Sequence, residues 1–142
     1  MLLRIVIGLI FVVSGAEKLI WPYQNFLYVI QGYQLVPPGL DEAVAQVFPW
    51  IEFLVGLFMV LGFWLHWTLR GVLVMVMTFI LIVSQALIRK LPMDECGCFG
   101  ELISFPLPVV ILIDSTLLAL TCLLIVKEKK TEAVSLDRYF QK

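Results

Sequence analysis

Two cysteines in one short polar segment are the residues best suited to chemistry. Cys96 and Cys98 stand in the run CGCFG at residues 96–100, between two long apolar stretches. The thiolate is the reacting form of cysteine, and thiol–disulfide exchange needs an accessible sulfur with a second thiol nearby. The intervening glycine frees the backbone, so that the two sulfurs can approach each other or a partner's cysteine. The pattern predicts a pair that cycles between dithiol and disulfide.

Two other roles for the cysteine pair stay open at this point. The thiols can be inert in exchange, either locked in a static bridge that closes the loop or free without a role. They can also bind a soft metal ion, since thiolates select Cu(I), Zn and similar ions. The whole chain has three cysteines and one histidine. A conventional Cys₄ or Cys₂His₂ zinc site within one chain is therefore excluded, and we expect no resident metal.

The composition indicates which elements must position these residues. Of the 142 residues, 61% are hydrophobic and only 15% are charged, which is too little polar surface to cover a soluble fold. The length favours one domain. The net charge is −1 and no basic block is present, so a nucleic-acid partner is not expected. We therefore predict an all-α integral membrane protein whose main partner is the lipid bilayer.

The apolar stretches predict a bundle of four transmembrane helices in a membrane domain at residues 1–130. Each stretch is long enough for a helix to cross the hydrocarbon core of a bilayer. The expected spans lie at about residues 2–20, 48–65, 68–88 and 106–126. Residues 131–142 are expected to form a polar cytoplasmic tail.

A shorter segment separates the first two spans. Residues 26–36 mix apolar side chains with Gln31, Tyr33 and Gln34, and the segment is too short to cross a membrane. It is predicted to be an interfacial or re-entrant piece. A helix is then expected to begin at Asp41 and to continue through Pro49 into the second span.

The basic side chains predict the orientation. With four spans, three basic residues lie on the face opposite the termini, namely Lys18, Arg89 and Lys90. Seven lie on the face of the termini, namely Arg4, Arg70, Lys127, Lys129, Lys130, Arg138 and Lys142. Because basic residues concentrate on the cytoplasmic side, both termini are expected in the cytoplasm and the protein in the cytoplasmic (inner) membrane. The cysteine loop then faces outward, into the compartment where disulfides persist.

The predicted topology brings three charged residues to the same outer depth as the cysteines. They are Glu17 and Lys18 at the end of the first span, and Glu52 in the second. A lysine near thiols lowers their pKa, and a carboxylate can carry the proton that exchange releases. The alternative is structural, with these residues forming a partly buried ion pair that joins helices 1 and 2.

A fourth charged residue lies deep in the last span. An unpaired charge at Asp114 would be costly there. We expect this carboxyl either to be protonated or to hydrogen-bond with Thr78, Ser84 or Gln85 of the third span. It has either a role in proton relay or substrate contact, or a role in packing. Cys122, further along the same span, is interpreted as a small buried hydrophobe.

Three motifs in this order resemble the MauE/DoxX family of redox-associated membrane proteins. They are SGxxKL at residues 14–19, PxxE at residues 49–52 and CGCFG at residues 96–100, and the resemblance covers about residues 4–126. It implies a four-helix membrane bundle linked to thiol chemistry. MauE-type members are associated with the maturation of methylamine dehydrogenase, whose small subunit is disulfide-rich, together with a thioredoxin-like partner. DoxX-like relatives are linked to sulfur-compound oxidation or oxidative stress, some with quinone as the electron acceptor.

The leading prediction is a membrane redox accessory protein, a component of a thiol–disulfide oxidoreductase system. Its partner would be a thioredoxin-like or disulfide-bearing exoplasmic protein. A quinone between the helices is a chemically reasonable acceptor, but no motif shows a quinone site. The competing predictions are a transporter or binding protein for a soft metal or sulfur species, with Asp114 marking its path, and a structural subunit of a larger membrane complex. The predicted catalytic residues are Cys96, Cys98, Lys18 and Glu52, with Glu17 and Asp114 as secondary candidates.

Overall fold

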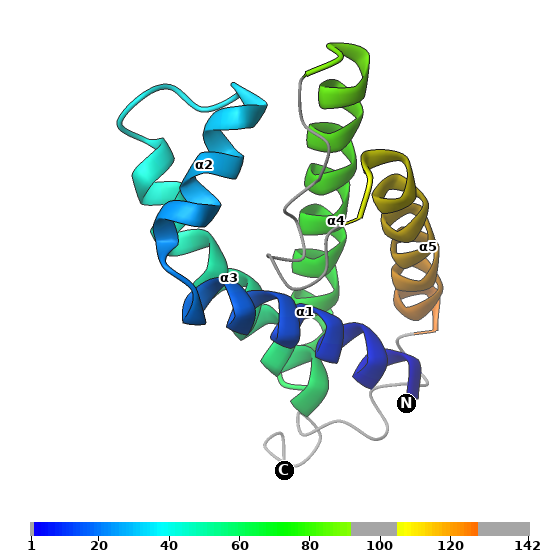
Figure 1. The fold of residues 1–142 in the computed structure, drawn as a ribbon. Helices are drawn as coiled ribbons and strands as arrows, with labels where there is room; N and C mark the ends of the chain where they lie inside the picture. Colours follow the sequence, from blue (N-terminus) through cyan, green and yellow to red (C-terminus); the bar gives the residue numbers. More distant parts are fainter. Residues whose placement is uncertain (1, 92–104, 128–142) are drawn as a thin grey trace.

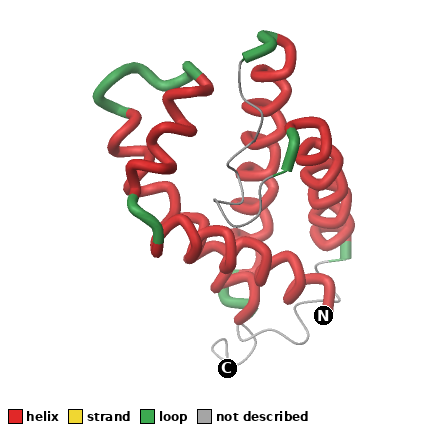
Figure 2. Tube along the Cα trace, viewed as in Figure 1, coloured by secondary structure: helices red, strands yellow, loops and turns green. Residues whose placement is uncertain are grey.

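The computed structural model describes residues 2–91 and 105–127, and these residues form α-helices and connecting turns without a strand (Figure 2). The all-α prediction is confirmed. The described helices are α1 (Leu2–Ile20), α2 (Tyr23–Tyr33), α3 (Asp41–Leu61), α4 (Leu65–Ile88) and α5 (Leu107–Val126).

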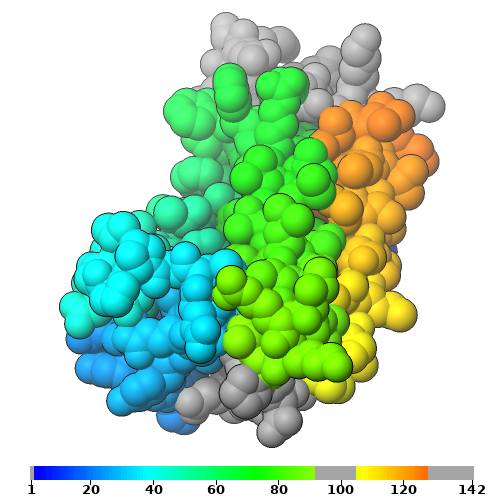
Figure 3. Space-filling view, turned by 90° about the horizontal axis from the view of Figure 1, so that it is seen from above, coloured from blue at the N-terminus to red at the C-terminus, as the bar shows by residue number. Residues whose placement is uncertain are grey.

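The helices form two groups that meet in one apolar core. α1 packs across α3, while α4 and α5 run side by side in opposite directions (Figure 1). The C-terminal end of α4, the N-terminal end of α5 and the α2–α3 connection all lie toward the top of Figure 1. Seen from above, α4 lies between the α2–α3 region and α5 (Figure 3).

Three of the described helices are long and apolar enough to cross a membrane, namely α3, α4 and α5. The membrane assignment is thus supported, but the predicted count of four spans is not confirmed. α1 has 19 residues, yet it carries three charged side chains, Arg4, Glu17 and Lys18, and it does not qualify by composition. Its role as a fourth span belongs with the proposals below.

The segment expected between the first two spans is a short helix. α2 contains 11 residues and begins at Tyr23, three residues before the predicted start. Pro22 precedes its first residue, where a proline does not interrupt helical hydrogen bonds. The helix ends at Tyr33, and Gln34 after it adopts a left-handed conformation with φ of 52°. α2 is too short to span a bilayer, and its interfacial position stays a prediction.

Asp41 fixes the connection from α2 to α3. Its Oδ2 accepts a hydrogen bond of 2.7 Å from Gln31 Nε2, and its Oδ1 accepts one of 2.9 Å from the backbone N–H of Gly39. Gly39 has a φ of +99°, a backbone conformation that favours glycine. α3 begins at Asp41 and continues through Pro49, as expected.

Apolar side chains from α1, α3, α4 and α5 form the main core. Its buried members include Ile7, Phe11, Met59, Leu69, Val72, Val76 and Leu117. A smaller cluster joins Tyr33 of α2 to Val83 of α4 and to Leu107 and Val110 of α5. Large apolar side chains also cover the outside of the helices, as at Val74, Leu81 and Leu112, each more than 60% exposed. Such a surface suits contact with lipid.

Candidate functional site

α1 and α3 approach each other so closely that only glycine fits at their contact. A Cβ atom added at Gly15 would lie 2.6 Å from the backbone nitrogen of Phe53, and one at Gly56 would lie 2.6 Å from that of Val12. Small residues allow this type of backbone-to-backbone packing between membrane helices. The contact brings the polar end of α1 against the middle of α3.

Three polar side chains meet at this contact and satisfy one another. Lys18 Nζ donates to Glu52 Oε2 at 2.8 Å and to Ser14 Oγ at 2.9 Å. Ser14 Oγ in turn donates to Glu52 Oε1 at 2.8 Å, so both carboxylate oxygens accept a hydrogen bond. The Lys18 and Glu52 side chains are only 1% and 2% exposed. The Phe26 ring of α2 covers the ammonium group, with its centroid 5.5 Å from Nζ.

This geometry bears on the two roles predicted for Lys18 and Glu52. The structure brings the two residues together as a buried ion pair between the first two long helices, which matches the structural alternative. Their role toward thiols stays a prediction. Ser14 was not among the predicted site residues. Its signal was its spacing of four residues from Lys18, which places both side chains on one face of α1.

The other predicted site residues are placed as follows. Glu17 is buried beside Lys18 on α1, with 6% of the residue exposed. Cys96 and Cys98 lie outside the described residues. Cys122 is exposed on α5, so its interpretation as a buried hydrophobe is wrong. Every side of α5 is apolar, and the sequence therefore does not show which side faces the core.

Asp114 is buried in α5, with 3% of the residue exposed. Its Oδ2 has no hydrogen-bond partner among the described residues, so the predicted bonds to Thr78, Ser84 and Gln85 are not formed there. Thr78 donates to the carbonyl of Val74 instead, at 2.8 Å. Both polar side-chain atoms of Gln85 are likewise buried without a partner in that part of the chain.

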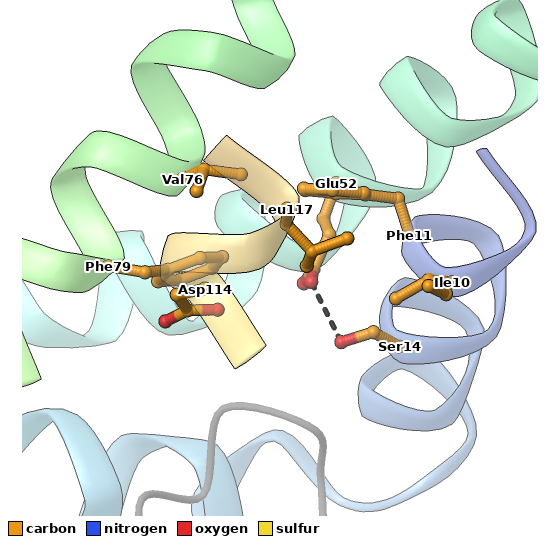
Figure 4. Close-up of a pocket in the computed structure, with 8 residues that line it drawn as sticks. All are labelled: Ile10, Phe11, Ser14, Glu52, Val76, Phe79, Asp114 and Leu117. Atoms are coloured by element: carbon orange, nitrogen blue, oxygen red, sulfur yellow. Dashed lines mark hydrogen bonds between the residues drawn. The ribbon is translucent and has the colours of Figure 1, made fainter. Parts of the chain in front are cut away.

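A small cavity joins Asp114 to the polar network (Figure 4). Its volume is about 10 Å³. Its polar lining is Ser14 from α1, Glu52 from α3 and Asp114 from α5, and its apolar lining is Ile10, Phe11, Val76, Phe79 and Leu117. The structure thus brings a predicted catalytic residue and a secondary candidate to one cavity.

Tyr33 of α2 lies near enough to Asp114 to sense its charge. Burial raises the pKa of Tyr33 to about 12, and a charged Asp114 carboxylate adds to this rise. The hydroxyl is therefore neutral at physiological pH. Asp114 consequently has polar or ionisable neighbours on three other helices, α1, α2 and α3.

The described residues contain no group of three or more histidine, cysteine, aspartate or glutamate side chains that could hold a metal ion. The cavity has room for about one water molecule. A quinone ring does not fit in it.

The chain was compared with known proteins. Neither a curated protein nor a solved structure matches it. A family model described as methylamine utilisation protein MauE matches residues 1–127, which include all five described helices and the CGCFG run. This match covers most of the 142 residues and agrees with the MauE part of the resemblance seen in the three motifs. The chain belongs to the MauE family.

Proposed function

We propose that this chain is a membrane-bound thiol–disulfide exchange protein that helps an exoplasmic protein of methylamine utilisation to mature. Membership of the MauE family supports the biological setting. The observation that carries the proposal is the CGCFG run in the segment between two helices of membrane-spanning length. A connection between two such helices lies at a membrane face, where an exoplasmic partner can reach it.

The proposed topology has four spans, with α1 as the first. α1 packs closely on α3, and its Lys18 charge is neutralised there by Glu52, so α1 can cross a bilayer as part of the bundle. With α1 included, the excess of basic residues favours cytoplasmic termini. The α4–α5 connection then faces outward, where disulfides form.

The exchange reaction uses only the two thiols and a partner disulfide. The thiolate of one cysteine attacks a sulfur of the partner disulfide, which forms a mixed disulfide and releases one partner thiolate. The second cysteine then attacks the mixed disulfide and releases the other partner thiolate. The pair becomes a disulfide, the partner gains two electrons, and the two protons of the pair pass to the partner thiolates. The reverse reaction oxidises a partner dithiol.

Lys18 and Glu52 are proposed to act as positioning residues, because their polar atoms already bond to each other and to Ser14. They hold α1 against α3 and so keep the bundle that presents the α4–α5 connection. The thiol-tuning role remains open to test by the pH dependence of Cys96 and Cys98 alkylation in a Lys18→Met variant. If the folded Lys18→Met variant shows the same pH dependence of alkylation as the unmodified chain, the result supports the positioning role alone.

The exchange proposal is tested by trapping thiol states in native membranes. Acid quenching followed by maleimide mass-tagging, with and without reductant, reports the oxidation state of Cys96 and Cys98. We expect a mixture that shifts with added oxidant, and a higher-mass adduct in either Cys96→Ala or Cys98→Ala. Cys122→Ala is the matched control, because Cys122 is a thiol of the same chain outside the CGCFG run.

Three results contradict the exchange proposal. A fully oxidised pair that resists mild reductant and traps no partner indicates a structural bridge. Free thiols that a soft metal protects from maleimide indicate a metal-binding protein. An adduct that forms with Cys122 rather than with Cys96 or Cys98 places the exchange chemistry outside the CGCFG run.

A further inference from the structure

The two sides of the cavity differ in whether the buried charged group has a partner of opposite charge. On one side the Lys18 ammonium matches the Glu52 carboxylate, and Ser14 completes their hydrogen bonds. On the other side no salt bridge to Asp114 occurs within residues 2–91 and 105–127. A buried carboxylate without a partner is costly, whereas a protonated carboxyl is neutral and gains an O–H donor. The energetics favour one bound proton at Asp114.

The cavity has the size and the polar lining that a single water molecule needs. A cavity of roughly 10–15 Å³ holds one water, which requires two to four polar partners. The volume here is about 10 Å³. The Glu52 carboxylate and the Ser14 hydroxyl line one side, and the Asp114 side chain enters from α5 on the other (Figure 4). Asp114 Oδ2 is buried and has no hydrogen-bond partner in the described part of the chain.

The surroundings also favour a proton over a larger cation. Three side chains supply oxygen atoms to the cavity, while the remaining lining from α1, α4 and α5 is apolar. Among the described residues, Glu52 of α3 lines the cavity with Asp114, Lys18 of α1 bonds to the lining residue Ser14, and Tyr33 of α2 is affected by the charge of Asp114. Glu17 of α1 is buried but does not line the cavity. A metal cation would need more oxygen ligands than this lining offers, and the Lys18 ammonium would repel it.

We propose that this cavity is a proton-binding site inside the bundle, in which Asp114 carries an exchangeable proton and one water molecule links it to Glu52 and Ser14. The proton moves between the Asp114 carboxyl and the water, and the Lys18–Glu52 pair holds the opposite wall in place. The site goes beyond thiol exchange and does not depend on the cysteines.

The test is infrared difference spectroscopy of the full chain in lipid nanodiscs. We expect a C=O band of a protonated carboxyl at neutral pH that shifts in D₂O, because the proton exchanges with water. Asp114→Asn should abolish the band and Asp114→Glu should move it. Asp41→Asn is the matched control and should leave the band unchanged, since Asp41 is satisfied by hydrogen bonds in the α2–α3 connection.

Further variants test the water and keep the proposal separate from the exchange reaction. Val76→Ile adds a methylene to the cavity lining, and we expect it to slow deuterium exchange of the band several-fold. The Cys96→Ser/Cys98→Ser double variant should keep the band while losing disulfide exchange. If Asp114→Asn fails to fold, the moved band of Asp114→Glu still identifies the residue.

Three results overturn the proposal. The first is an Asp114 carboxyl that is fully ionised at neutral pH. The second is a band that survives in both Asp114 variants, which assigns the proton to another group. The third is a band that disappears when sodium replaces choline at constant ionic strength, which shows that the cavity binds a metal cation.

Discussion

The Lys18–Glu52 pair and Asp114 are buried charged groups of opposite kinds. At the α1–α3 contact, glycines bring the backbones together, and Lys18, Glu52 and Ser14 satisfy one another. At the α4–α5 contact the packing is mainly apolar, and Asp114 and Gln85 are buried with side-chain atoms that lack partners among the described residues. The two pairs differ in composition as well, because α1 carries three charged residues while α4 and α5 are both apolar enough to span a membrane.

This difference separates a structural role from a functional one. The buried ion pair, with its hydrogen bonds to Ser14, fixes α1 against α3. Asp114 is buried as well, but its Oδ2 has no hydrogen-bond partner among the described residues, so the proposed proton site lies there. The following variants either abolish this contrast or define it more closely.

The largest effect is expected for Glu52→Ala. The substitution leaves the Lys18 ammonium buried without its counter-charge, which costs about 3–5 kcal/mol of unfolding free energy. Unfolding in mixed detergent micelles, followed by circular dichroism, measures this change. The control is the Lys18→Met/Glu52→Leu double variant, which removes both charges and should regain most of the loss. An equal loss in both variants would show that the pair is not the main contact.

A smaller loss is expected for Gly15→Ala. The added Cβ would meet the Phe53 backbone at 2.6 Å, and separating the helices costs about 1–3 kcal/mol. The same unfolding assay reports it. Gly71→Ala is the matched control, because no atom lies within 4 Å of its added Cβ. The gain in helix propensity from glycine to alanine is common to both variants, so equal changes in stability would show that the close contact does not control the outcome.

Asp114→Asn should change the unfolding free energy by no more than about 1 kcal/mol, because Asp114 Oδ2 has no hydrogen-bond partner among the described residues and the amide keeps the shape of the carboxyl. The measurement is again unfolding in mixed detergent micelles, and the loss of stability is compared with that of the Glu52→Gln variant. Glu52→Gln removes the charge that Lys18 needs and should lose clearly more stability. A loss at Asp114 as large as the loss at Glu52 would remove the contrast between the two contacts.

The smallest effect is expected for Cys122→Ser. The side chain is exposed on α5, and substitutions at exposed positions usually change stability by less than about 0.5 kcal/mol. Thermal unfolding in nanodiscs provides the measurement. A large loss would place this side chain in a contact with another protein molecule, which the single chain does not show.

The sequence predicted the bounds of the helices better than it predicted which face of each helix points toward the core. α1 begins and ends at the predicted residues, and the helix from Asp41 continues through Pro49 as expected. The pairing of Lys18 with Glu52 was foreseen as one alternative, because a charge in a span needs a partner. Ser14 was missed, since a serine in a membrane helix usually bonds to its own backbone.

The remaining errors have a common physical cause. In α5 nearly every side chain is apolar, so helical periodicity does not distinguish the core side from the lipid side, and Cys122 was assigned to the wrong one. The expected partners of Asp114 were polar residues of the third span, but the sequence does not specify which of them face α5. The Thr78 hydroxyl donates instead to the backbone carbonyl of Val74 in its own helix. Which side chains of two largely apolar helices contact each other is known only from the three-dimensional structure.

The Lys18–Glu52 pair also has a consequence for the synthesis of the chain. Lys18 leaves the ribosome 34 residues before Glu52, so the first helix emerges with a charge whose partner has not yet been made. Its three charged residues also set α1 apart from the helices that are apolar enough to span a membrane. In the proposed four-span topology, entry of α1 into the bilayer therefore costs less in the company of α3 than alone. In that topology α1 depends on a helix made after it to settle in the membrane.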